Sequence, residues 1–138
     1  MPNITMFLVC DSINNFSPQP EINIPQLMGP QCVLRPQFIP STFSFGLAVG
    51  VAGVDSNEQN TIRFTITNPA GAIIQNSGDT VFPPIGIDDT MPKEYQGFML
   101  SLDIRNLLIE KEGVYTFTLY VNNVEIGHKE IPVFKGRK

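Results

Sequence analysis

Few side chains in this sequence are suited to acid–base, nucleophilic or metal chemistry. His128 is the single histidine, and Cys10 and Cys32 are the only cysteines among 138 residues. A zinc site needs three or four ligands, and an activated nucleophile needs a base beside it. We expect His128 to lie opposite Phe117 on a partly exposed strand. The sequence therefore predicts a protein that is not an enzyme and that uses no cofactor.

Two acidic segments are the remaining candidate cation ligands. Asp88 and Asp89 lie in a loop rich in proline and glycine, and a polar segment spans residues 55–60. Calcium loops usually alternate acidic residues with others, so that several oxygens converge on the ion. The Asp88-Asp89 loop does not alternate in this way, so we expect solvated loop charges there, and we expect 55–60 to be a polar connection between strands; we expect no metal ligand in either segment. A small-ligand or calcium-binding sensor stays open as an alternative function.

The chain carries little charge, and its balance is acidic. Thirteen acidic and nine basic residues give a formal charge of −4, and only 16% of the residues are charged. Because phosphate binding needs clustered cations, we expect no nucleic-acid partner. A charge-poor surface is typical of interface cores, although a β-rich domain with Thr, Ser, Asn and Gln on its solvent faces gives the same composition. Both interpretations stay open.

Hydrophobic runs in the sequence are short. None approaches the roughly 18 apolar residues that would cross a bilayer, and the first ten residues lack the basic segment of a signal peptide. We therefore expect a soluble, cytoplasmic protein with no membrane contact. In that compartment Cys10 and Cys32 are expected to be reduced, buried thiols.

Apolar residues recur at every second position, which is the pattern of strands with one buried face. The clearest row covers residues 43–51, where small residues occupy the intervening positions. Further rows lie at 62–66, 98–104 and 115–121, and the turn residues 68–71 predict a hairpin between 62–66 and 72–75. Asn122-Asn123 predicts a two-residue hairpin, because asparagine tolerates the positive φ that such a turn requires. The apolar phase slips after Ile126, which predicts a bulge at Gly127.

Prolines dominate the segment 14–42, which contains six of the twelve. Because each proline removes a backbone donor, we expect extended chain that wraps a sheet, with residues 31–34 as the best short edge strand. The only helical spacing is that of Ile104, Leu107 and Leu108, which predicts one helical turn ended by Gly113. Together these patterns predict one all-β domain over residues 1–138, an antiparallel β-sandwich of about seven strands.

Residues 102–117 resemble the crossing between two strands of immunoglobulin domains, in the spacing Leu-x-Ile-x-x-Leu-x-x-x-Lys-x-Gly-x-Tyr-x-Phe. Lys111 stands where the family usually has Asp, and Phe117 stands where it has a disulfide cysteine. The resemblance implies an immunoglobulin-like sandwich in which the Tyr115 hydroxyl reaches backbone upstream.

The chain as a whole resembles an uncharacterised family of short bacterial immunoglobulin-like β-sandwich proteins. The resemblance rests on the Phe-Leu-Val-Cys-Asp-Ser opening at residues 7–12, the Phe43-x-Phe45 start of the first long strand, and the ending at 113–127. It implies a cytoplasmic, non-catalytic β-sandwich, and it carries over no site residue.

Apolar residues in a long loop form the candidate binding surface. Phe82, Ile85 and Ile87 lie there, and such loops at the end of a sandwich can form recognition surfaces. The alternative is that Phe82 and Ile85 fold back and close the end of the core. The edge strand after His128 is a second candidate surface. We therefore expect a binding or assembly module that recognises a protein partner or a second copy of itself, with a virion or other structural-assembly protein as an alternative.

Overall fold

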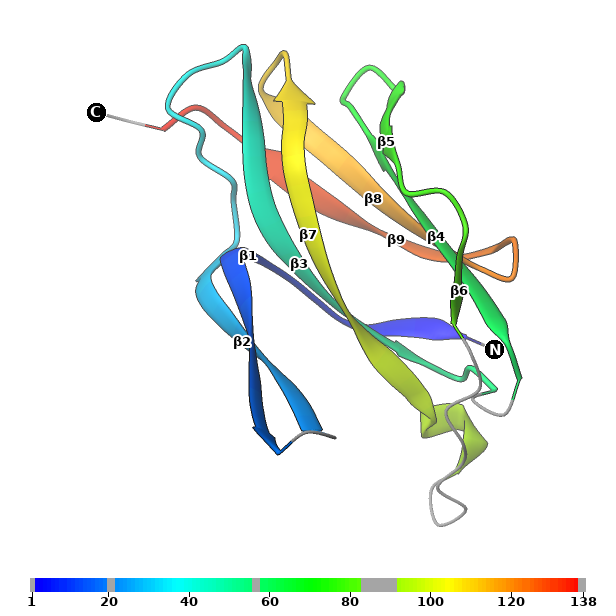
Figure 1. Ribbon diagram of the computed structural model, residues 1–138. Coiled ribbons are helices and arrows are strands. Elements are labelled where there is room, and N and C mark those ends of the chain that lie inside the picture. Colours follow the sequence, from blue (N-terminus) through cyan, green and yellow to red (C-terminus); the bar gives the residue numbers. More distant parts are fainter. Residues whose placement is uncertain (1, 20–21, 56–57, 83–91, 137–138) are drawn as a thin grey trace.

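The computed structural model describes residues 2–19, 22–55, 58–82 and 92–136, which form two antiparallel sheets packed face to face (Figure 1). One sheet has the strand order β2-β1-β3-β7, and the other has the order β5-β4-β8-β9 with β6 also paired to β4. The predicted all-β sandwich is confirmed, with nine strands in the described residues instead of seven. The strands are β1 (Asn3–Gln19), β2 (Ile22–Gln31), β3 (Ser41–Ala52), β4 (Asn60–Thr67), β5 (Ile73–Asn76), β6 (Thr80–Phe82), β7 (Gly97–Ile109), β8 (Gly113–Val121) and β9 (Val124–Val133).

The core lies between the two sheets, where the predicted apolar rows face each other. Leu47 and Val49 of β3 are fully buried, as are Phe117 and Leu119 of β8. Phe117 lies at the centre of an aromatic cluster, because its ring centroid is 5.2 Å from that of Phe7 in the other sheet and 5.4 Å from that of Phe64. Burying side chains of this size contributes about 1.5–3 kcal/mol each, so these rows hold the sheets together.

The predicted helical turn at residues 104–108 is wrong, because β7 continues as a strand to Ile109. Phe45 pairs with Ile104 and Phe43 pairs with Leu107, so two residues of β7 oppose one residue of β3. Asn106 has a φ of 54° within this bulge. The extra residue moves Leu107 back to the buried face, and a three-residue apolar spacing therefore arises without a helix. The one short helical turn among the described residues is a 3₁₀ turn at Lys93–Tyr95, before β7.

The predicted edge strand at residues 31–34 is also wrong. The proline-rich chain instead forms the second half of β1 and all of β2, and β2 ends at Gln31. Pro25 and Pro30 both lie in β2, the edge strand of its sheet. An edge strand tolerates proline because one side of its backbone needs no hydrogen-bond partner.

The β8–β9 hairpin has the predicted turn and bulge. Asn122 and Asn123 have φ values of 52° and 66°, and the register slips by one residue between Leu119–Gly127 and Tyr120–Glu125. The same slip corrects the predicted position of His128, which lies opposite Thr118 and not Phe117. The register expected from the turn alone omitted the bulge residue.

Tyr115 has the role that the resemblance implies. Its ring is 1% exposed at the start of β8, and its hydroxyl donates a 2.8 Å hydrogen bond to the carbonyl oxygen of Lys111. This bond ties the turn between β7 and β8 to the core. Gly113, with a φ of 145°, allows the chain to enter β8 from that turn.

Replacing Tyr115 by Phe should lower the free energy of unfolding by about 1–2 kcal/mol, because a part-buried carbonyl loses its donor. The measurement is the urea midpoint at unchanged m-value. Tyr95→Phe is the matched control, since Tyr95 is 67% exposed, and it should leave the midpoint unchanged. Equal midpoints for wild type and Tyr115→Phe would contradict this role.

Replacing Asn123 by Ala should destabilise the protein by about 1 kcal/mol, because alanine disfavours the left-handed conformation of this turn. Asn123→Gly should be as stable as wild type or slightly more so, since glycine adopts a positive φ without a steric penalty. Thermal melting of both variants tests the turn. The same loss in both variants would show that the Asn123 side chain, and not its backbone conformation, matters.

Candidate recognition cleft

The second half of β1 leaves the sheet and forms a two-stranded ribbon with β2 (Figure 1). The pairing of β1 with β3 ends at Cys10–Gly46, whereas its pairing with β2 continues to Gln19–Ile22. We call this ribbon, residues 12–19 of β1 and 22–31 of β2, the arm. None of these residues is charged, and Glu21 lies outside the described residues.

The chain rejoins the sandwich directly after the arm, but in the other sheet. Leu34 bridges Val133 in parallel, and its backbone N–H donates to the carbonyl oxygen of Pro132 at 2.9 Å. Phe134 donates to Leu34 and Gly136 donates to Pro36, at 3.0 and 2.8 Å. The arm is therefore an insertion between a segment that pairs with β3 and a segment that lies beside β9.

Small residues on β3 bring the base of the arm close to the sheet. Leu47 and Val49 face the core, so Gly46, Ala48 and Gly50 face outward, because side chains alternate along a strand. A β-carbon at Gly46 would lie 3.0 Å from both Cys10 Sγ and Ile13 Cγ1, so a larger residue would require these two side chains to shift by a few tenths of an ångström.

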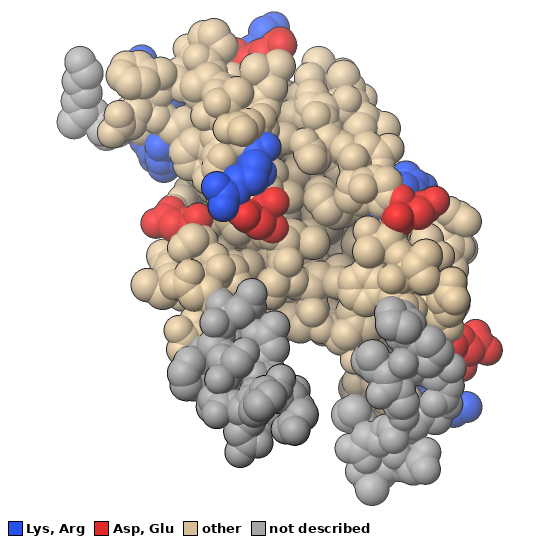
Figure 2. Space-filling view, in the orientation of Figure 1, with Lys and Arg blue, Asp and Glu red and all other residues tan. Residues whose placement is uncertain are grey.

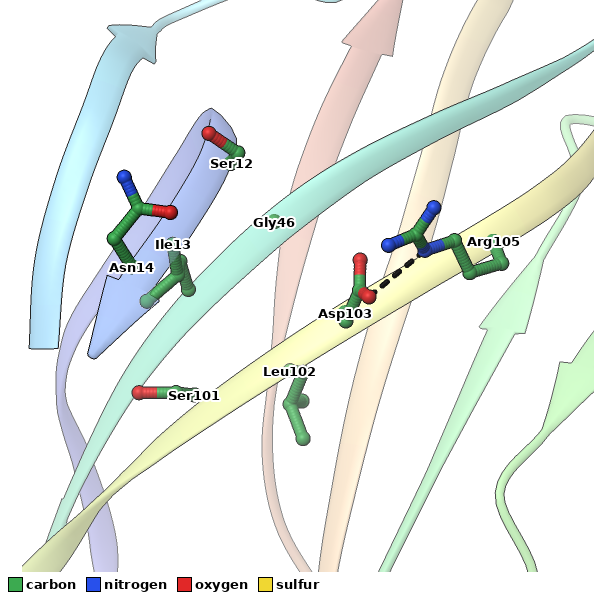
Figure 3. A pocket seen from close by; sticks show the side chains of 8 residues that line it. All are labelled: Ser12, Ile13, Asn14, Gly46, Ser101, Leu102, Asp103 and Arg105. Atoms are coloured by element: carbon green, nitrogen blue, oxygen red, sulfur yellow. Dashed lines mark hydrogen bonds and ion pairs between the residues drawn. The ribbon is translucent and has the colours of Figure 1, made fainter.

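A cleft of about 300 Å³ lies between the arm and the outer face of this sheet (Figure 3). Ser12, Ile13 and Asn14 line it from the arm, Gly46 lies in its floor, and β7 contributes its other side. The residues from β7 are Ser101, Leu102, Asp103 and Arg105. The cleft is therefore an open wedge, because β1 diverges from β3 while β7 stays paired with β3 in the sheet.

The cleft is polar but has no net charge. The Arg105 guanidinium donates to Asp103 at 2.8 Å, and both side chains are more than 60% exposed. Gln31 donates from its side-chain amide to Asp11 at the base of the arm. An exposed ion pair contributes at most about 1 kcal/mol, so Asp103 and Arg105 stay available to a ligand. Hydroxyls, an amide and a neutralised ion pair offer the donors and acceptors that a polypeptide segment needs.

The residues predicted to bind a partner are not brought together here. Phe82 is half-buried and stacks on Phe98 with a centroid distance of 5.4 Å, so its ring packs against the core, as in the alternative interpretation. Ile85 and Ile87 lie outside the described residues, as do Asp88 and Asp89. The proposed role of this loop stays a prediction.

The candidate chemical groups are dispersed. His128 is exposed on β9. Across the described ranges, no group of three or more His, Cys, Asp or Glu side chains could hold a metal ion. The residues that line the cleft were missed at the sequence level. Two signals point to them in retrospect, namely the stretch 12–31, in which Glu21 is the single charged residue, and the small residues that alternate through β3.

The cysteines differ from the expected pair of buried thiols. Both are free, but Cys32 is exposed and Cys10 alone is buried. Burial, with a smaller contribution from the Asp11 carboxylate, raises the pKa of the Cys10 thiol above its ordinary value. Both causes disfavour the thiolate.

No protein-family model matches this chain, and no curated protein matches it. Within the described residues, no helix is long and apolar enough to cross a membrane.

Titration with a thiol-specific chromophore at neutral pH should modify one cysteine per folded chain, because only Cys32 is exposed and the thiolate is the reactive species. The second cysteine should react only after denaturation. Cys32→Ser should remove the fast phase, and Cys10→Ser should leave it intact. Two fast-reacting thiols in the native protein would contradict the packing of Cys10 against Gly46.

Proposed function

We propose that this protein is a non-catalytic, immunoglobulin-like module that acts through protein–protein recognition. The observation that carries the proposal is the arm, a two-stranded ribbon that extends beyond its sheet and has a polar cleft beneath it. A two-stranded ribbon is at best marginally stable in water by itself. A partner that fills the cleft would cover one face of the arm and stabilise it.

Strand order supports an immunoglobulin-like arrangement. With the arm set aside, β1, β3 and β7 are adjacent in one sheet, and β4, β8 and β9 are adjacent in the other. These correspond to strands A, B and E and strands C, F and G of the immunoglobulin fold. The hydrogen bond from Tyr115 is a second supporting feature, because it matches the tyrosine corner before strand F. Likeness to the short bacterial family, and with it a cytoplasmic location, is part of this proposal.

Chemistry at the cleft supports recognition over catalysis. Ser12 and Ser101 supply hydroxyls, but no histidine or cysteine lines the cleft to activate them. Arg105 is held by Asp103 in an exposed pair, which suits contact with backbone carbonyls or polar side chains. Structural assembly is the version of this function in which the partner is another copy of the chain.

Light scattering after size-exclusion chromatography, over a hundredfold concentration range, tests the proposal. We expect either a reversible rise in mass or a complex of fixed stoichiometry with a purified partner protein. Calcium should leave the melting temperature unchanged, whereas calcium at a hundred times its Kd would stabilise the fold by about 2.7 kcal/mol. A calcium-dependent shift, or an enzymatic turnover that His128→Ala abolishes, would overturn the proposal.

A further inference from the structure

We propose that the cleft recognises a carboxamide group, presented by a glutamine or asparagine side chain of a partner protein, through the pair Asp103 and Arg105. This inference rests on the proposed recognition function and names the chemical group that the cleft selects. Both residues line the cleft, and Arg105 Nε donates to Asp103 Oδ2 at 2.8 Å.

The Asp103–Arg105 pair faces the arm across a glycine. Side chains alternate along a strand, so Asp103 and Arg105 lie on the same face of β7. The residue opposite Asp103 on β3 is Gly46, which has no side chain to come between the pair and the arm. Figure 3 shows the Arg105 side chain extending toward Asp103 and the arm. The Asp103 and Arg105 side chains are 67% and 73% exposed, so a ligand in the cleft can reach both.

The pair favours a neutral ligand over an ionic one. Coulomb energy falls only as the inverse of distance, and the two charges are in hydrogen-bond contact. An ion that approaches one charge therefore approaches the other, and repulsion offsets most of the attraction. Figure 2 shows that charged side chains are sparse on this face and lie beside side chains of opposite sign. No excess of either charge on this face draws an ion into the cleft.

A carboxamide complements both members of the pair at once. The bond to Asp103 uses Nε of Arg105, and a guanidinium has further N–H donors on its two terminal nitrogens. The carboxylate has two oxygens and accepts several hydrogen bonds. The oxygen and nitrogen of an amide are about 2.3 Å apart, so one amide can accept from Arg105 and donate to Asp103 side by side. A carboxylate ligand lacks the donor, and an ammonium ligand lacks the acceptor.

The size and the remaining lining of the cleft favour one side chain of a polypeptide. A cleft of about 300 Å³ is at the lower limit of ligand pockets, so it admits a side chain with a short length of backbone. Ile13 is partly buried and offers an apolar contact to the methylene groups of that side chain. Ser12, Asn14 and Ser101 are exposed, and they can form hydrogen bonds with the backbone on either side.

Binding of short capped peptides tests the proposal. The probe is Gly-Gln-Gly with acetyl and N-methylamide caps, so that its side chain carries the only primary amide. Peptides with glutamate, lysine or methionine in place of glutamine are the matched probes. We expect the glutamine peptide to shift the backbone NMR signals of Ser101, Asp103 and Arg105, and we expect the other three to bind about tenfold more weakly.

Breaking the pair should change which peptide binds best. Asp103→Asn leaves Arg105 without its counter-ion, so the glutamate peptide should bind better than the glutamine peptide. Arg105→Gln leaves the carboxylate alone, so the lysine peptide should bind best. Exposed ion pairs contribute little to stability, and the melting temperatures of both variants should equal that of wild type.

Asp79→Asn is the matched control for the change in charge. Asp79 forms an ion pair with Arg63 of the other sheet at 3.6 Å, away from the cleft. This variant makes the same substitution as Asp103→Asn at a second ion pair. It should keep the wild-type preference for the glutamine peptide.

The outcomes separate carboxamide recognition from the proposed function. A glutamine peptide that binds no better than its counterparts, or a preference that Asp103→Asn does not reverse, overturns carboxamide recognition and leaves protein recognition standing. Propionamide that binds as tightly as the glutamine peptide overturns the assignment to a polypeptide. Failure of the proposed function has a different signature, namely the calcium-dependent melting shift or the turnover that His128→Ala abolishes.

Discussion

Contact between Phe7 and Phe117 joins the two sheets, and the rest of the molecule is arranged around it. In the immunoglobulin pattern that residues 102–117 resemble, a disulfide cysteine stands where this chain has Phe117. A buried phenylalanine contributes an amount comparable to a disulfide, since its removal typically costs about 3–5 kcal/mol and a disulfide contributes about 2–4. Both cysteines of this chain are free. A packed aromatic cluster therefore gives this sandwich its link between sheets without requiring oxidation.

The packed sandwich fixes both ends of the segment that contains the arm. Cys10 is the last residue of β1 paired with β3, and Leu34 is the first that bonds to β9, so both ends of the insertion are tied to the core. Insertions between fixed points cost little additional closure entropy as they lengthen. The sandwich can therefore hold a long ribbon such as the arm. The shape of the cleft depends on the angle at which β1 diverges from the small residues of β3.

Period-two rows and turn chemistry were sufficient to predict the sandwich, because both depend on neighbours in sequence. The Asn122-Asn123 turn and the bulge beside Gly127 are local in this sense, and both are present. The bulge at Asn106 was misinterpreted, since its three-residue apolar spacing imitates a helix. The cleft could not be predicted from sequence, because Ser12 and Ser101 line the same cleft only through the register of three strands and the bend of β1.

Edges of the sheets are poorly suited to adding a strand, which favours the cleft as the binding surface. Edge strands that avoid pairing use prolines, bulges, charges or short length. The edge strand β2 contains Pro25 and Pro30, β5 has four residues, and β7 is bulged at Asn106. The strand after His128 has exposed Lys129 and Glu130, and its end is covered by the chain at Leu34. The described edges are therefore poorly suited to pairing, which supports the proposal that a partner would be recognised at a face of the protein and not at an edge.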